Sequence, residues 1–151
     1  KMQEGSVDRF GQGLQKVITV FDQASLPEYD AKVVSSTFPD TILAGRDVNV
    51  EMVFMNTGKK EWKMSDQVFL GAVDNQDDLA SSYYWRVGYG TRIIPHGSTY
   101  AFKIKINQSV LGTYNTDWQM VKEGAFWFGE KLVKEVQVID STAASNWSLF
   151  K

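Results

Sequence analysis

Apolar and polar residues alternate along most of the chain beyond residue 30. In one clear run, Tyr100, Phe102, Ile104 and Ile106 alternate with less apolar residues. This two-residue period is typical of antiparallel strands that bury one face. Turn-forming glycine, proline and asparagine separate the runs, as expected for a two-sheet sandwich. The predicted strands are residues 31–38, 47–55, 67–73, 83–89, 99–106, 114–121 and 132–139.

The first 28 residues follow a different pattern, which predicts a helix with an apolar stripe. Gly11 and Gly13 oppose this helix by roughly 1 kcal/mol each. Two roles stay open for the stripe: it packs on its own domain, or it joins two copies in a homodimer through residues 6–26. The stripe consists of Val7, Phe10, Leu14, Val17, Phe21 and Ala24. The predicted organisation is a helical extension at 1–28, a β-sandwich at 29–140 and a tail at 141–151.

Four segments carry a resemblance to a known family. They are "VNVEMVFMNTGKKEW" (48–62), "WRV" (85–87), "IPHG" (94–97) and "GTYNTDWQMVKEGAFWFG" (112–129). Together they resemble the immunoglobulin-like domain named for the Next-to-BRCA1 protein, also called the four-tryptophan domain, in its bacterial and archaeal extracellular form. The resemblance implies an all-β fold, an Ig-like antiparallel β-sandwich of about seven strands following the N-terminal helix. It also implies a binding or spacer module without chemistry of its own.

The resemblance also assigns roles to individual aromatic residues. Two of the family's tryptophans align with Trp62 and Trp118, and the other two fall on Met52 and Val133. We expect Trp62 and Trp118 to lie in the core. Tyr114, just after a glycine at a strand start, resembles a tyrosine corner, in which the hydroxyl bonds to the backbone.

Composition argues against several classes of activity. The chain of 151 residues has a net charge of -2, no run of basic residues longer than two, and no cysteine. We therefore expect no nucleic-acid partner and no thiol chemistry. The single histidine, His96, lies in a Pro-His-Gly turn, where we expect a solvated side chain. No catalytic device or cofactor motif is visible, so we predict a protein that is not an enzyme and binds no cofactor.

The acidic stretch "DNQDD" is the remaining candidate for metal binding. Asp74, Asp77 and Asp78 offer oxygen ligands of the kind that calcium prefers. The glycine and the distal glutamate of an EF-hand loop are missing from this stretch. A solvated acidic loop is therefore the favoured interpretation, with calcium as the weaker alternative.

Exposed aromatic residues are the strongest candidates for ligand binding. On the predicted strand 83–89, Tyr84 and Arg86 share the face opposite the expected core, and Trp127 lies in a hairpin. Such aromatics anchor protein partners or stack on sugars. We predict a non-catalytic protein-interaction, adhesion or spacer module of a secreted or cell-surface prokaryotic protein. Its parent chain would be anchored to a membrane or cell wall. The alternative is a carbohydrate-binding module using Tyr84 and Trp127.

Overall fold

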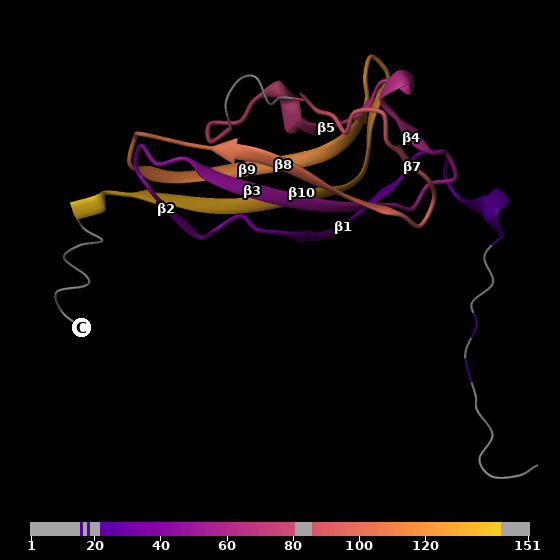
Figure 1. The fold of residues 1–151 in the computed structure, drawn as a ribbon, viewed down its shortest axis with the longest axis horizontal. Coiled ribbons are helices and arrows are strands. Elements are labelled where there is room, and N and C mark those ends of the chain that lie inside the picture. The colour runs from indigo at the N-terminus through magenta and orange to yellow at the C-terminus, as the bar shows by residue number, and fades with distance from the viewer. Residues whose placement is uncertain (1–15, 17, 19–21, 81–85, 143–151) are drawn as a thin grey trace, which may run out of the picture.

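The chain folds into two stacked sheets, whose strands follow the long axis of the molecule (Figure 1). This computed structural model describes residues 16, 18, 22–80 and 86–142. The three-stranded sheet has the order β1 (Ala31–Ser36), β3 (Val48–Asn56), β8 (Thr99–Ile106). The five-stranded sheet has the order β2 (Thr41–Leu43), β10 (Phe126–Ile139), β9 (Gly112–Lys122), β5 (Val68–Ala72), β6 (Arg86–Val87). A two-stranded ribbon pairs β4 (Trp62–Lys63) with β7 (Ile93–Ile94).

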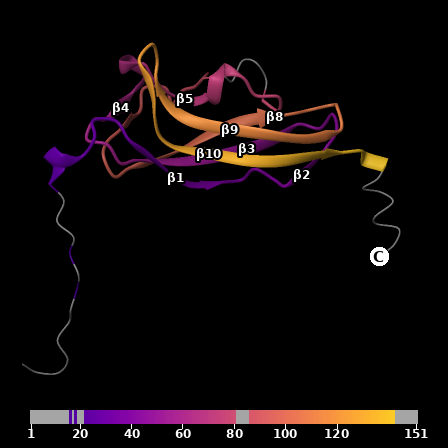
Figure 2. The same ribbon diagram turned by 180° about the vertical axis from the view of Figure 1, so that it is seen from behind.

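Short 3-10 turns η2 (Gln23–Ser25), η3 (Met64–Asp66) and η4 (Val73–Asn75) supplement the strands. Seen from behind, the described N-terminal residues and the end of β10 leave the sandwich at opposite ends (Figure 2). The helix predicted for residues 1–28 falls largely outside the described residues. Within them, Lys16, Ile18 and Asp22 belong to no element, and Gln23–Ser25 form only a 3-10 turn.

The predicted alternation is confirmed where the structure describes it. In β3, Val50, Met52 and Phe54 are almost completely buried, while their neighbours along the strand are partly or fully exposed. The same holds for β8, which pairs with β3 antiparallel from Ile106 to Thr99. Because one side of each strand is apolar, the two sheets bury these sides against each other.

Tryptophans lie at the centre of this core, as predicted. Trp62 and Trp118 both have 0% exposure. Tyr114 packs against the core, and its hydroxyl donates a hydrogen bond of 2.8 Å to the Val110 carbonyl. The predicted tyrosine corner is therefore confirmed.

The Asn-Thr-Gly segment after β3 has a structural role. Asn56 is completely buried, and its amide nitrogen donates to the carbonyls of Lys60 at 2.9 Å and Ile94 at 2.7 Å. Its amide oxygen accepts from the Gly58 N–H at 3.0 Å. A Cβ at position 58 would lie 2.5 Å from the backbone nitrogen of Asp30, so only glycine fits this crossing.

The strand predicted at 132–139 begins earlier, at Phe126, so Trp127 lies in β10 and pairs with Val121 of β9 rather than lying in a hairpin loop. The other differences from the predicted strands concern short elements. Of the strand predicted at 83–89, the described residues include only β6, and 81–85 lie outside them. The strands β2, β4 and β7 were not predicted. β2 pairs with β10 in parallel, because the chain crosses from one sheet to the other after β1.

Candidate functional site: the outer face of the five-stranded sheet

The solvent-facing side of strands β9 and β10 carries polar residues around one exposed valine. Val133 is 63% exposed, and its Cα partner on β9 is Asp117. The adjoining η4 turn adds further acidic residues beside β9. We call this surface the β9–β10 outer face. It consists of Asp74, Asp78, Asn115, Asp117, Val133 and Glu135.

Sequence analysis named Val133 only as the position of a family tryptophan and not as a binding residue, although the strand pattern places it on the exposed side. Val133 has the same parity along β10 as Glu135 and Gln137, which are both exposed, whereas Val136 and Val138 are buried. Val133 is therefore an apolar residue on the otherwise polar side of an alternating strand. The resemblance placed a family tryptophan at this position and another at Met52, which is completely buried.

A hollow of about 210 Å³ lies at this face. It is lined by Val73, Asp74, Gln76, Asp77, Asp78, Asn115 and Asp117. In the part of the chain that the structure describes, no basic side chain forms an ion pair with any of these aspartates. Within the described residues, the negative charge of the hollow is therefore not balanced by an ion pair.

Asp77 connects this hollow to the core. Its carboxylate accepts hydrogen bonds from the N–H groups of Leu79 at 2.9 Å and Ala80 at 2.8 Å, and from the Thr116 hydroxyl. The hydroxyl of Thr116 in turn accepts from the indole N–H of Trp118 at 2.8 Å. Burial raises the pKa of Asp77, and the nearby Asp117 carboxylate raises it further. Asp77 therefore has a structural role that links the loop to a core tryptophan.

The calcium candidates gain no support from this geometry. Among residues 16, 18, 22–80 and 86–142, no three acidic or histidine side chains converge closely enough to hold a metal ion. Asp77 already uses its oxygens for the loop and Thr116. Asp74 and Asp78 are exposed.

Arg86 and Trp127, two of the predicted binding residues, lie together on the same sheet. The guanidinium carbon of Arg86 is 4.9 Å from the centroid of the Trp127 ring. Gly71 makes this contact sterically allowed. A Cβ there would lie 2.8 Å from Arg86 Nη1 and 2.9 Å from Trp127 Cζ3. The third predicted binding residue, Tyr84, lies outside the described residues.

The charge of Arg86 is already compensated within the protein. Its Nε donates to Glu123 Oε2 at 2.6 Å, and its Nη2 donates to Glu123 Oε1 at 3.2 Å and to Asn75 Oδ1 at 2.5 Å. Hydrogen bonding to Arg86 holds the pKa of Glu123 below its usual value. This bidentate pair fixes the direction of the Arg86 guanidinium, which lies over the Trp127 ring. The binding role of Arg86 and Trp127 stays a prediction.

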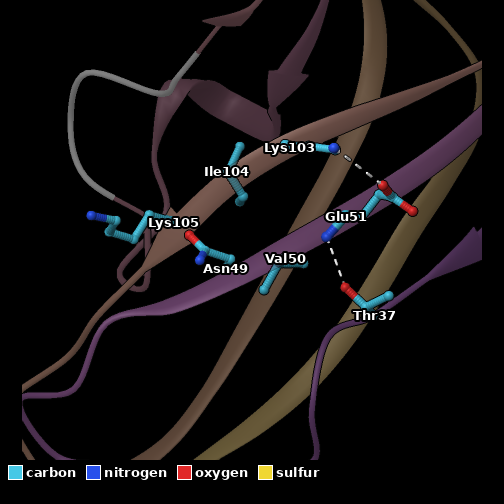
Figure 3. A pocket seen from close by; sticks show the side chains of 7 residues that line it. All are labelled: Thr37, Asn49, Val50, Glu51, Lys103, Ile104 and Lys105. Carbon is cyan, nitrogen blue, oxygen red and sulfur yellow. Dashed lines mark hydrogen bonds and ion pairs between the residues drawn. The ribbon is translucent and has the colours of Figure 1, made fainter.

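The opposite sheet presents a hollow with balanced charge. This hollow of about 490 Å³ is lined by Thr37, Asn49, Val50, Glu51, Lys103, Ile104 and Lys105 (Figure 3). Lys103 lies 4.0 Å from Glu51, and Lys105 lies 3.4 Å from Asp47. The Thr37 hydroxyl accepts a hydrogen bond from the Glu51 N–H at 2.8 Å. The larger hollow differs from the β9–β10 outer face because its lysines lie beside carboxylates, whereas the aspartates of that face form no ion pair in the described part of the chain.

His96 is exposed in a turn, as predicted, and its Nδ1 lies 2.9 Å from the Gly58 carbonyl oxygen. No helix in the described part of the chain has the length and apolar character needed to span a membrane.

Comparisons with known proteins establish the fold. No protein-family model and no curated protein matches the chain. The CARDB domain of PF1109 from Pyrococcus furiosus is similar in structure, with a TM-score of 0.53 and 11% identity over 76% of this chain and 98% of that domain.

Two further solved structures resemble the chain more distantly. A conjugative transposon lipoprotein from Bacteroides eggerthii has a TM-score of 0.37 and 8% identity, covering 72% of this chain and 96% of that protein. A PapD-like domain of human CEP192 has a TM-score of 0.40 and 11% identity, covering 86% of this chain and 98% of that domain. The similarity to four-tryptophan domains stays a prediction. The fold itself is all-β and immunoglobulin-like.

Proposed function

We propose that this chain is a non-catalytic protein-interaction module of a secreted or cell-surface protein, and that it binds through the β9–β10 outer face. The observation that carries the proposal is Val133, an apolar side chain 63% exposed in the middle of a strand. Polar and charged residues surround it, among them Asp117 and Glu135 and the exposed Lys131, in the manner of an anchor inside a polar rim. The sequence resemblance to extracellular modules supports the cellular setting.

The positions of the titratable groups with shifted pKa values support a role without catalysis. A catalytic site brings such groups together in a cleft, where they act on one substrate atom. Here each group serves a separate structural contact. Asp40 pairs with Lys134, and burial raises the pKa of Tyr89, whose hydroxyl bonds to a backbone carbonyl.

A carbohydrate-binding role through Tyr84 and Trp127 is the weaker alternative. Sugar recognition by stacking needs an open aromatic face. One face of Trp127 is covered by Arg86, whose guanidinium carbon lies 4.9 Å from the ring centroid. A glycan array with wild type and Trp127→Ala tests this alternative, and binding that depends on Trp127 would favour it over the protein partner.

Photocrosslinking in the parent protein tests the proposed function. A photoreactive amino acid at position 133 should capture a partner, and excess unlabelled chain should compete for it. The matched control is the same amino acid at position 103, where the Lys103 side chain is 77% exposed on the other sheet. The partner, once purified, should bind the chain saturably, and Val133→Lys should weaken that binding. No competed crosslink from either position would contradict a protein-interaction role.

A further inference from the structure

We propose that Met64 is a redox-sensitive modification site, whose oxidation to the sulfoxide releases the loop at residues 88–92 and withdraws Tyr89 from the core. The chain has no cysteine, so its five methionines carry all of its sulfur. Oxidation of a methionine thioether is reversible and turns an apolar side chain into a polar one. Met64 begins the η3 turn and is not part of the β9–β10 outer face, so this site is separate from the proposed partner surface.

The sulfur of Met64 holds the backbone of the loop that follows β6. Its Sδ accepts hydrogen bonds from the N–H groups of Tyr89 at 3.1 Å and Gly90 at 2.9 Å. Gly88 adds a steric condition, because a Cβ there would lie 2.7 Å from Sδ and 2.6 Å from Cε of Met64. The thioether therefore lies directly against three successive residues of the loop.

Tyr89 joins this contact to the core. It is 4% exposed, and its hydroxyl donates a hydrogen bond of 3.0 Å to the Val68 carbonyl. The centroid of its ring lies 5.6 Å from that of Tyr100 and 5.9 Å from that of Phe102. Because the backbone N–H of the same residue is bonded to Met64, a change at the sulfur acts directly on a core aromatic residue.

An oxygen atom on the sulfur does not fit this arrangement. A thioether sulfur accepts hydrogen bonds with its lone pairs, and a sulfoxide oxygen is bonded to sulfur through one of them. An oxygen acceptor needs about 2.7–3.2 Å to an N–H nitrogen, but the nitrogens of Tyr89 and Gly90 already lie within 3.1 Å of the sulfur itself. Either the loop moves outward or the Met64 side chain leaves it, and both movements break the hydrogen bonds to sulfur.

Met64 lies close enough to solvent for an oxidant to reach it. Its side chain is partly buried against the core, whereas Gly88 and Gly90 beside it are exposed. Hydrogen peroxide is a sufficient oxidant. The sulfur lone pair attacks one peroxide oxygen, the O–O bond breaks, and the second oxygen leaves as water with both protons. Met52 and Met120 are 0% exposed and are shielded from this reaction while the chain is folded.

Peroxide treatment of the folded chain tests the proposal. The protein carries Met2→Leu and Met55→Leu, so that Met64 is the one methionine left besides the two buried ones. Mass spectrometry of proteolytic fragments should locate one added oxygen at Met64, and the amide resonances of 88–92 should shift. Amide hydrogen exchange of the loop N–H groups at 89 and 90 should become at least about fivefold faster, as expected when two hydrogen bonds are lost. Methionine sulfoxide reductases should reverse these changes.

The matched control is Met64→Leu in the same background, because leucine fills a similar volume but has no sulfur to oxidise. Without peroxide, this variant already lacks the acceptor for both loop N–H groups, so their amide hydrogens should exchange faster than in the parent. Adding peroxide should change nothing further in this variant.

Three results would overturn the proposal. The first is a Met64 sulfoxide that leaves the resonances and the hydrogen exchange of 88–92 unchanged. The second is a folded wild-type chain in which Met64 stays unoxidised at peroxide concentrations that convert the partly exposed Met55. The third is an equal response of Met64→Leu to peroxide, which would assign the change to another residue.

Discussion

Asn56 offers a sharp test of how the β3 turn is held. Its buried amide serves three backbone groups, the Gly58 N–H and the carbonyls of Lys60 and Ile94. Replacing Asn56 by alanine leaves the Gly58 N–H and the Ile94 carbonyl buried without this partner. Each such group costs about 1–3 kcal/mol, so Asn56→Ala should lose about 2–6 kcal/mol. That is a large part of a total stability of about 5–15 kcal/mol.

Asn56→Asp gives the same site a dependence on pH. The new carboxyl keeps an acceptor for Gly58 but turns oxygens toward the carbonyls of Lys60 and Ile94. Burial and this repulsion raise the pKa of the new carboxyl in the folded state. Its protonated form therefore favours folding below the unfolded pKa of about 3.9, and that contribution is lost as pH rises through the folded pKa.

Urea unfolding followed by tryptophan fluorescence measures both variants at about pH 7 and about pH 4. The control is Asn49→Ala, which alters an exposed asparagine of the same strand and should stay within about 0.5 kcal/mol of wild type. A loss below about 1 kcal/mol for Asn56→Ala would refute the buried-network argument. So would an Asn56→Asp variant that is destabilised equally, relative to wild type, at both pH values.

Further predictions concern the core and the sheet surface. Trp118→Ala should cost about 3–5 kcal/mol in calorimetry, since the side chain has 0% exposure, and a loss below about 1 kcal/mol would show that it is not core. Gly71→Ala should cost about 1–3 kcal/mol by displacing Trp127 and Arg86, and an unchanged midpoint in urea would contradict the packing. Because the pKa of Glu123 in the folded state lies below its ordinary value of 4.5, the ionised carboxylate stabilises the fold at pH values above 4.5. This contribution is lost as pH falls through the folded pKa. In Glu123→Gln, the free energy of unfolding should fall less as the pH is lowered, and unfolding measured at a series of pH values will show this.

Alternation and tryptophan placement predicted much of the sandwich. The long strands β3, β8, β9 and β10 each contain enough residues to show a two-residue period. The core positions of Trp118 and Met120 follow directly from that period. The three short strands β2, β4 and β7 contain only two or three residues each, and so few residues define no period.

The site residues were harder to predict, because the pairing of strands brings together residues that lie far apart in the sequence. Arg86 and Trp127 lie on strands β6 and β10, which are separated by β9 and β5 in the sheet. Their contact also needs Gly71, whose role follows only from the close approach of both side chains. The exposure of Val133 could have been predicted from the alternation along β10, because Val133 falls on the same side as Glu135 and Gln137. The acidic hollow depends on how the η4 turn folds beside β9, which the sequence pattern does not specify.

Mapping the bound face with the partner identified by crosslinking tests the central claim most directly. Amide resonances of the chain should be recorded with increasing amounts of that partner. Binding through the β9–β10 outer face predicts shifts at Asp117 and Val133, with Asn49 and Lys103 of the other sheet unchanged. Shifts confined to the three-stranded sheet, with Asp117 and Val133 unmoved, would contradict it.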